Sequence, residues 1–446
     1  MSEALEQSDL REGYKAIKLG PREIPIPGEW KSVPFEEAIE LNPKYNKPDN
    51  GPFDYLPMDA VDEKKQTIEY WTERGKDDCT TTWFKNGDTV YAKITPCTEN
   101  GKIAFIDGLS TEIGSGSTEF LVFHPREGVT DERFVYYLSN LPEFRSVTIS
   151  LMEGSTGRQR VPSDVFKGSL HIPLPPLHEQ RRIADILSTV DNQIQQTDKI
   201  LSDKKELRKG LVAQLIRTGL DSHDPVSKRI GPKEYSIADG WELREIRELS
   251  ADEKKAIRGG PSGTQLKNAE YGNDGAKVYG QEHVSAHDFS RGDKFLAEGE
   301  FNDFQSVEIL PDDILVTMMG TVGDSAVFPP EAERGIMDSH LLRIRSDQQT
   351  VVPEFLSIMI DESKIVEDQI HSLSHGLVMS GLNIGIVKSL TIPVPPTDEQ
   401  QEFVQILSKA LDSIRTEERR LQDLQGLKRG LMQDLLTGVV RVNTDN

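Results

Sequence analysis

The chain has 446 residues, which at roughly 150 residues per domain predicts about three domain-sized pieces and excludes a single small module. Apolar residues make up 36% and charged residues 28%, a balance typical of a packed soluble protein and too hydrophobic for wholesale disorder. The 52 Lys and Arg against 74 Asp and Glu give a net charge of −22, which argues against nonspecific wrapping of nucleic acid or binding to anionic membranes. Any contact with DNA must therefore be local.

The cysteines and the hydropathy pattern indicate a cytoplasmic protein. Cys79 and Cys97 are the only cysteines, too few for a disulfide framework and without the paired spacing of a zinc site. No stretch approaches 18 consecutive apolar residues, and residues 1–10 carry no apolar run. We therefore expect neither a signal peptide nor a membrane span.

A first variable block, residues 30–171, has short apolar runs such as 89–92 and 120–123, separated by Gly, Asp and Asn clusters, and a helical pattern at 134–138. This pattern predicts a strand-rich α+β domain. Two of its loops carry donors suited to phosphates and guanine edges. The candidate DNA-binding residues on these loops are Lys93, Thr95, Asn100, Lys102, Arg158, Gln159 and Arg160.

A long helix is predicted next, over 178–217. Pro175-Pro176 cannot continue a helix backwards, Glu179 sits in the first turn, and Gly219 is a plausible stop. The predicted helix has about 40 residues and a length of roughly 60 Å. The following stretch, 221–228, is interpreted as a loop that joins two halves.

The second variable block, 241–391, repeats the pattern of the first, with apolar runs at 314–317 and 341–344 and a helical pattern at 355–359. We expect the two blocks to share one fold. The densest basic patch of this acidic block supplies the candidate DNA-binding residues Lys255, Arg258, Thr264 and Lys267. A second long helix is predicted over 398–436, ending before Gly438.

An internal repeat organises the whole chain. Residues 172–180, Ile-Pro-Leu-Pro-Pro-Leu-His-Glu-Gln, recur 220 residues later as Ile-Pro-Val-Pro-Pro-Thr-Asp-Glu-Gln, and the ungapped match of 44 positions has 16 identities. A second match, Gly-Pro-Arg-Glu at 20–23 and Gly-Pro-Lys-Glu at 231–234, opens each half at an offset of 211. Each half is therefore a variable block followed by a shared helix.

The two helices show coiled-coil spacing. Because each variable block is tied to the start of its own helix, we expect the helices to pack antiparallel, with the two domains at opposite ends. The predicted seam consists of Leu187, Ile194, Leu201, Leu407, Ile414 and Leu421. In both copies the leucine stripe then shifts register, at 207, 211 and 215 and at 427, 431 and 435, which indicates a packed partner.

Local signatures of catalysis are missing from the sequence. There is no GxxxxGK[ST] loop, no GxGxxG after a strand, no HExxH and no tetrad of the amino-methyltransferase kind. His178-Glu179 could suggest a metal or a general base, but its copy is Asp398-Glu399, so a role at the helix start is favoured. An enzyme with a dispersed active site remains an alternative. So does a coiled-coil adaptor that binds partners through its PxxP segments and does not touch DNA.

The Pro-Pro-x-x-Glu-Gln motif that opens a long helix twice, each time after a variable block, resembles the specificity subunit of type I restriction-modification enzymes. The likeness covers nearly the whole chain. Residues 93–102, Lys-Ile-Thr-Pro-Cys-Thr-Glu-Asn-Gly-Lys, and 116–120, Gly-Ser-Thr-Glu-Phe, look like segments of that family's target recognition domains. Residues 319–323 look like their counterpart and add Thr321 to the candidate DNA-binding residues. The second block lacks the Ile-Thr-Pro-Cys stretch, so the two domains are expected to read different sequences.

The resemblance implies a non-catalytic subunit that reads double-stranded DNA, with two similar target recognition domains joined by two antiparallel coiled-coil helices in a pseudo-two-fold repeat. Each domain would read one half of a bipartite target, and the helices would dock two methyltransferase subunits, which restriction subunits join. S-adenosylmethionine, ATP and magnesium would belong to those partners, with no catalytic or metal site here. The expected segments are an N-terminal segment (1–19), recognition domain 1 (20–171), connector and helix 1 (172–219), a linker (220–230), recognition domain 2 (231–391), connector and helix 2 (392–438) and a tail (439–446).

Overall fold

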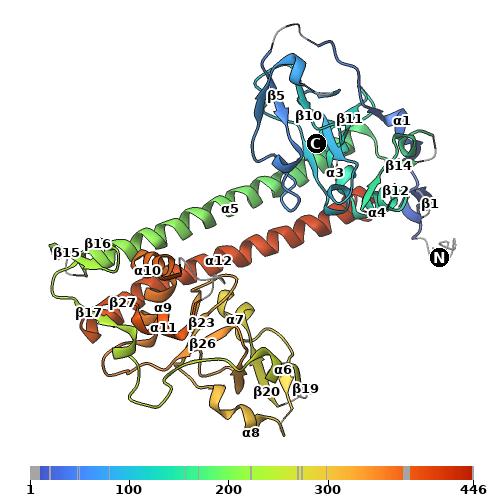
Figure 1. Ribbon diagram of the computed structural model, residues 1–446. Helices are drawn as coiled ribbons and strands as arrows, with labels where there is room; N and C mark the ends of the chain where they lie inside the picture. Colours follow the sequence, from blue (N-terminus) through green and yellow to red (C-terminus); the bar gives the residue numbers. More distant parts are fainter. Residues whose placement is uncertain are drawn as a thin grey trace. The chain divides into compact units, whose positions relative to one another are not determined.

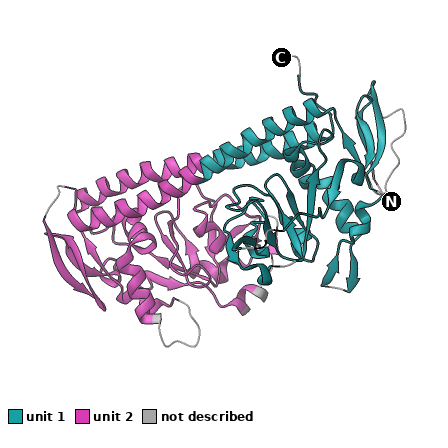
Figure 2. Cartoon of the chain, turned by 90° about the horizontal axis from the view of Figure 1, so that it is seen from above, with its two compact units in different colours: residues 1–198, 419–446 teal, residues 199–418 magenta. Residues whose placement is uncertain are grey.

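The computed structural model describes residues 11–443 except 20–21, 48, 50, 80, 156, 169, 221–223, 269–270, 273–274, 298 and 375–381. The chain forms two compact units, which Figure 2 distinguishes by colour. Unit 1 comprises residues 1–198 and 419–446, and unit 2 comprises residues 199–418. Both long helices therefore contribute residues to both units.

Unit 1 contains a terminal hairpin, two four-stranded sheets and the helices that cover them (Figure 1). One sheet has the order β4-β11-β8-β9 and is antiparallel, and the other has the order β6-β5-β10-β7 with β5 and β10 parallel. The strands are β1 Tyr14–Leu19, β2 Arg22–Pro27, β3 Lys31–Pro34, β4 Ile39–Leu41, β5 Phe53–Leu56, β6 Thr72–Arg74, β7 Thr82–Phe84, β8 Thr89–Ala92, β9 Ile103–Phe105, β10 Gly114–Gly116, β11 Phe120–Pro125, β12 Glu153–Ser155, β13 Arg158–Arg160 and β14 His171–Leu174. The helices are α1 Phe35–Ala38, α2 Cys97–Asn100, α3 Glu132–Asn140, α4 Pro142–Ser150, the start of α5 Leu177–Thr218 and the end of α12 Thr397–Leu436.

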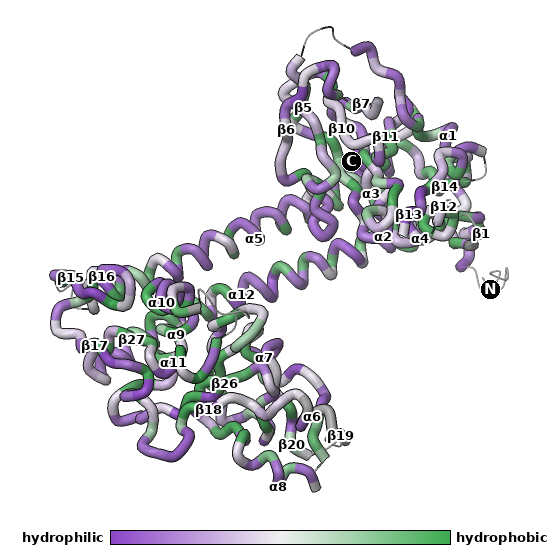
Figure 3. Tube along the Cα trace, in the orientation of Figure 1, coloured by the Kyte–Doolittle hydropathy of each residue, from purple (hydrophilic) through white to green (hydrophobic). Residues whose placement is uncertain are grey.

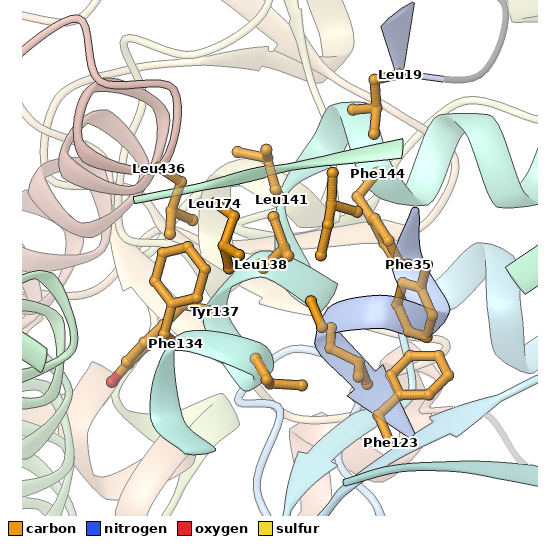
Figure 4. Packing of buried hydrophobic residues seen from close by; sticks show 14 of the residues in the cluster. Leu19, Phe35, Phe123, Phe134, Tyr137, Leu138, Leu141, Phe144, Leu174 and Leu436 are labelled. Atoms are coloured by element: carbon orange, nitrogen blue, oxygen red, sulfur yellow. The ribbon is translucent and has the colours of Figure 1, made fainter. Parts of the chain in front are cut away.

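The core of unit 1 joins the recognition domain to the long helices. Phe35 packs edge-on against Phe123 of β11, with ring centroids 5.0 Å apart. The same cluster contains Leu187 of α5 and Leu436 of α12, and Figure 4 shows Leu436 beside the α3 side chains. Helix α3 begins where the carboxylate of Asp131 accepts two backbone N–H groups. The domain is therefore anchored to its helices by a shared apolar core.

Unit 2 repeats this architecture. Its antiparallel sheet β18-β26-β23-β24 corresponds to β4-β11-β8-β9, and its five-stranded sheet again contains one parallel pair, β20 and β25. The strands are β15 Pro225–Ile230, β16 Lys233–Ala238, β17 Glu242–Glu245, β18 Ile257–Gly259, β19 Tyr271–Gly272, β20 Ala276–Tyr279, β21 Phe295–Leu296, β22 Glu308–Ile309, β23 Ile314–Thr317, β24 Ser325–Val327, β25 Gly335–Met337, β26 Leu341–Ile344 and β27 Thr391–Val394. Besides the long helices, the helices are α6 Gly263–Asn268, α7 Gln281–Ser285, α8 Phe301–Phe304, α9 Pro353–Glu362, α10 Lys364–Ser374 and α11 Ile384–Ser389. The prediction that the two blocks share one fold is confirmed.

The repeated Glu of the Pro-Pro-x-x-Glu-Gln motif fixes the start of each long helix against its own domain. The carboxylate of Glu179 accepts a 3.0 Å hydrogen bond from the indole of Trp30 and is also bound by Arg441. In unit 2 the carboxylate of Glu399 accepts from the indole of Trp241 at 3.2 Å and from the backbone N–H of Leu220. The expected role of this Glu at the helix start is therefore confirmed.

The repeated Gln holds the connector and the helix start together. The side-chain amide of Gln180 donates to the carbonyls of Pro175 and Val129, and its oxygen accepts the N–H of Asp131. Gln400 makes the same three bonds, to Pro395, Thr350 and Val352. Both Gln side chains are buried, so each satisfies groups that would otherwise lose hydrogen bonds.

The PxxP segments are buried strands. β14 pairs with β3, and β27 pairs with β17, so Pro173 and Pro393 lie inside two-stranded sheets. The residues from Ile172 to Pro175 and from Ile392 to Pro395 are buried. A polyproline helix must expose its proline faces to a partner groove. The burial of these residues gives the adaptor alternative no support and agrees with rigid connectors.

The long helices run antiparallel within each unit. In unit 1, Lys428 of α12 pairs with Asp191 of α5 at 2.7 Å, while the start of α5 and the end of α12 share one apolar core. In unit 2, Lys204 of α5 contacts Glu417 of α12 at 2.9 Å, and just beyond the end of α5 the N–H of Leu220 donates to the carboxylate of Glu399. Residue numbers rise along α5 while the numbers of its partners fall, as predicted.

The residues of the predicted seam are not equally buried, and their packing against one another stays a prediction. Leu187, Leu201, Leu407 and Ile414 are buried, whereas Ile194 and Leu421 are only half-buried. Figure 3 shows many hydrophilic residues along α5 and α12 compared with the green cores of the units. Polar contacts therefore supplement a narrow apolar stripe.

One prediction about the junction between the halves is wrong. Residues 221–228 were expected to form a loop, but β15 pairs with β16 over its whole length, and the boundary placed at 230/231 falls in the turn of that hairpin. Residues 221–223 lie outside the described residues. β1 and β2 form the equivalent hairpin in unit 1. Gly219 and Gly438 end the two helices as predicted, both with positive φ.

A group of charged residues links the recognition domain of unit 2 to both long helices. Arg208 of α5 forms a short ion pair with Glu362 of α9. Next to it, Asp361 lies 3.8 Å from His287. Burial, together with the charges of Glu362 and Asp324, raises the pKa of Asp361 to about 7.

We expect Asp361→Asn to change the pH dependence of the stability of unit 2. An unfolded Asp has a pKa near 3.9, so between about pH 4 and pH 7 the folded form alone keeps this proton. The wild type should therefore lose up to about 1.4 kcal/mol per pH unit as the pH rises through this window, and the Asn variant should not. Urea unfolding at pH 5 and pH 8 measures the difference. His287, whose pKa is lowered by burial and then by Arg415 and Arg208, acts in the opposite direction and is present in both proteins.

Equal pH dependence of the stability of the two proteins would contradict the raised pKa of Asp361. Arg208 and Arg415 are the cations near this group, and Glu362 and Asp324 are its other acids.

Candidate DNA-binding surface

The structure brings together two candidate loops that are separate in the sequence of unit 1. Strands β12 and β13 form a two-stranded ribbon in which Glu153 lies opposite Arg160 and Ser155 opposite Arg158. The ribbon is attached to the 93–102 loop, because the N–H of Thr95 donates to the carbonyl of Gln159 and the N–H of Val161 donates to the carbonyl of Lys93. Both loops therefore belong to one surface.

The glycines of the ribbon serve its own geometry. Gly157 has a φ of +80°, which favours a residue without a Cβ. A Cβ at Gly154, whose φ is +130°, would lie 2.6 Å from the carbonyl oxygen of Arg158. Gly154 is therefore explained by the close approach of the two strands, and Gly157 by its positive φ.

Three predicted donors of the 93–102 loop are engaged within the protein. The hydroxyl of Thr95 donates to Glu99 at 3.0 Å, and the amide of Asn100 donates to Glu63 at 2.8 Å. The ammonium of Lys102 donates to the carbonyl of Met58 at 3.0 Å. These contacts order the loop.

The two arginines of the ribbon differ. Arg158 and Arg160 are two residues apart on one strand, so their side chains leave the same face of the ribbon. Arg160 forms a bidentate ion pair with Glu119, in which Nη2 lies 2.6 Å from Oε1. Arg158 is exposed and forms no hydrogen bond or ion pair with any other residue in the described part of the chain, and the same holds for the side chains of Lys93 and Gln159. The ribbon thus presents one unpaired and one oriented guanidinium.

In unit 2 the structure describes the side chains of three of the five predicted residues. Lys255 is exposed with a φ of +72°, and Arg258 is half-buried on β18, opposite Arg343 of β26. The hydroxyl of Thr321 contacts that of Ser285 at 3.1 Å. The side chains of Thr264 and Lys267 lie outside the described residues. Among the described side chains, no hydrogen bond or ion pair joins Lys255, Arg258 and Thr321 to one another.

Equivalent backbone bonds nevertheless relate the two candidate surfaces. The N–H of Lys93 donates to the carbonyl of Glu119, and the N–H of Met318 donates to the carbonyl of His340. The 319–323 segment thus occupies in unit 2 the position of the 93–102 loop in unit 1, as the sequence likeness predicted.

Sequence reasoning missed Glu119 as a site residue. It lies in the Gly-Ser-Thr-Glu-Phe segment, directly before β11, and 41 residues before its partner Arg160. Nothing in the spacing of that segment indicates an arginine partner on the β12–β13 ribbon.

Each unit also exposes one leucine on its part of the long helices. Leu207 of α5 is 71% exposed and Leu427 of α12 is 50% exposed, and these leucines occupy equivalent positions of the repeat. The residue that follows each leucine is a cation in an ion pair: Arg208 pairs with Glu362, and Lys428 pairs with Asp191. The helix orientation is therefore fixed by the cation, and the leucine faces solvent.

The described residues show no group of three or more His, Cys, Asp or Glu side chains arranged to hold a metal ion. Within the same residues no helix is long and apolar enough to cross a membrane. Cys79 and Cys97 are free thiols.

Residues 27–203 and 239–425 match the family described as Type I restriction modification DNA specificity domain, so the chain belongs to this family. It is 30% identical over 226 residues to the Type I restriction enzyme EcoAI specificity subunit of Escherichia coli, a match that covers 48% of this chain and 38% of that relative. It is 24% identical to the Type I restriction enzyme MjaVIII specificity subunit of Methanocaldococcus jannaschii, over 74% of this chain and 75% of the relative. The crystal structure of the type I restriction-modification system S subunit from M. genitalium has a similar fold, with a TM-score of 0.53 and 15% identity over 94% of this chain and 98% of that one.

Proposed function

We propose that the chain is the sequence-specific DNA-binding subunit of a type I restriction-modification complex, which reads a bipartite target through its two recognition domains. The β12–β13 ribbon carries this proposal. A two-stranded ribbon fits the major groove of B-DNA, where arginine side chains read guanine or bind phosphate. Arg158 and Arg160 leave one face of this ribbon, in a chain whose net charge of −22 would otherwise repel DNA.

The proposal assigns catalysis to other subunits. S-adenosylmethionine, ATP and magnesium are placed on methyltransferase and restriction partners, and the chain itself acts in the cytoplasm, where its DNA target is found. Partner subunits would also supply much of the phosphate neutralisation that this acidic chain lacks.

We also infer that two methyltransferase subunits dock on the long helices. Leu207 and Leu427 support this stoichiometry, because the repeat places the same exposed apolar residue twice. Two equivalent positions fit two copies of one partner.

Methylome sequencing with and without this gene tests the proposed function. A bipartite methylated motif that disappears with the gene is expected. An unchanged methylome in cells that express the partner subunits would contradict it, as would equal binding of the assembled complex to target and random duplexes.

We expect Arg158→Ala to weaken binding to all duplexes about equally and to reduce the salt slope by about one, because an unpaired exposed guanidinium contributes mainly by neutralising phosphate. Binding of the complex to specific and random duplexes at two salt concentrations measures both effects. Lys31→Ala is the control, since it removes one exposed positive charge from β3, away from the ribbon strands. An unchanged slope, or a loss confined to one base pair, would contradict this role.

A further inference from the structure

The ion pair between Glu119 and Arg160 leaves one edge of the guanidinium available. Nε of Arg160 lies 3.2 and 3.0 Å from the two carboxylate oxygens, and Nη2 lies 2.6 Å from Oε1. These bonds occupy the Nε–Nη2 edge. Of the five N–H groups of an arginine, both on Nη1 and the second on Nη2 remain, and one N–H from each of these two nitrogens forms the terminal edge.

That terminal edge has the geometry of a bidentate donor. Two parallel N–H groups match the N7 and O6 acceptors that guanine presents in the major groove. The side chain of Arg160 is 49% exposed while that of Glu119 is 25% exposed, so the carboxylate lies deeper than the group it holds. The hydrogen bonds from Arg160 also hold the pKa of Glu119 below its usual value, so the carboxylate is charged at neutral pH.

We propose that Glu119 is a positioning residue that orients the free edge of Arg160 to read one guanine in the half-site of unit 1. This inference rests on the proposed function. An exposed arginine otherwise loses conformational entropy when its rotatable bonds become ordered on binding. Pairing with Glu119 orders the side chain before DNA arrives.

The pairing also separates the roles of the two arginines. Glu119 and Arg160 together are neutral, so the pair contributes little to phosphate attraction, whereas Arg158 carries an unpaired charge. Removing the negative charge of Glu119 should therefore strengthen nonspecific binding while it weakens base discrimination. A residue with a purely structural role would not produce these opposite effects.

The experiment uses the chain assembled with its methyltransferase subunits. Methylome sequencing first defines the bipartite target, and binding is then measured on the target duplex, on duplexes with each base pair of one half replaced, and on random duplex. Arg160→Ala, Arg160→Lys and Glu119→Gln should each relax discrimination at the same G·C pair, by about 5- to 100-fold. The half-site read by unit 2 should be unaffected.

Glu37→Gln is the matched control. Glu37 is exposed on α1, outside the β12–β13 ribbon. Its replacement removes the same charge, but it should keep full discrimination at that G·C pair.

The inference is overturned if Glu119→Gln keeps the discrimination that Arg160→Ala loses. It is also overturned if neither arginine variant changes the discrimination at any base pair. Arg160→Lys keeps the charge and loses the bidentate edge, so it tests orientation even if Glu119→Gln lowers the stability of the domain. Failure of the proposed function looks different, because then no bipartite motif depends on the chain and the wild-type complex itself shows no base preference.

Discussion

Leu187→Asp is expected to unfold unit 1 while unit 2 stays folded. Leu187 is fully buried in the core that also contains Leu435 and Leu436 of α12. Losing a buried leucine costs about 2–5 kcal/mol, and a buried unpaired carboxylate adds several more. The free energy of unfolding of a domain is about 5–15 kcal/mol, so a cost of this size is enough to unfold unit 1. Hydrogen exchange, followed by peptide along the chain, measures protection in each unit separately.

Two further substitutions make this prediction specific. Leu407→Asp should have the reciprocal effect, because Leu407 is equally buried in the core of unit 2. Ile194→Asp should cost less, since Ile194 is only half-buried and its carboxylate can remain hydrated. Wild-type protection of unit 1 in the Leu187 variant would show that this core does not depend on α5.

The second large effect concerns assembly. We expect Leu207→Asp and Leu427→Asp together to abolish binding of the methyltransferase subunits, and each single change to leave one subunit bound. Burying a leucine at an interface contributes about 1.5–3 kcal/mol, and an aspartate in its place adds a desolvation cost, so each site should lose at least about tenfold in affinity. Native mass spectrometry of the co-expressed complex counts the bound subunits.

The control for this prediction is Ile200→Asp. Ile200 is 40% exposed on α5, one heptad before Leu207, but the equivalent position of α12 is Arg420, so it is not part of the repeated surface. Because all three positions are exposed, none of the changes should lower the stability of the chain itself by more than about 0.5 kcal/mol. Two bound subunits in the double variant would place the docking surface elsewhere.

The sequence by itself determined the elements that depend on local pattern and on the repeat. The two long helices begin within one residue of their predicted starts, at Leu177 and Thr397, because prolines exclude helix before them and heptad spacing continues after them. Gly219 and Gly438 end them because a positive φ there favours glycine. The strand-rich blocks, their common fold and the family resemblance follow from the same kind of information.

Which residues face each other was decided by the tertiary structure alone. Leu187 and Leu207 look alike in sequence. Leu187 is buried because the core of unit 1 packs against its turn of α5, whereas Leu207 lies on an exposed face. Residues 221–228 were predicted as a loop, but 225–228 belong to a strand whose hydrogen bonds come from its pairing with 233–238. Arg158 and Arg160 looked equivalent until Glu119, distant in the chain, paired with only one of them. Periodicity and propensity act over a few residues, whereas ion pairs, strand partners and burial depend on contacts that form only when the whole domain folds.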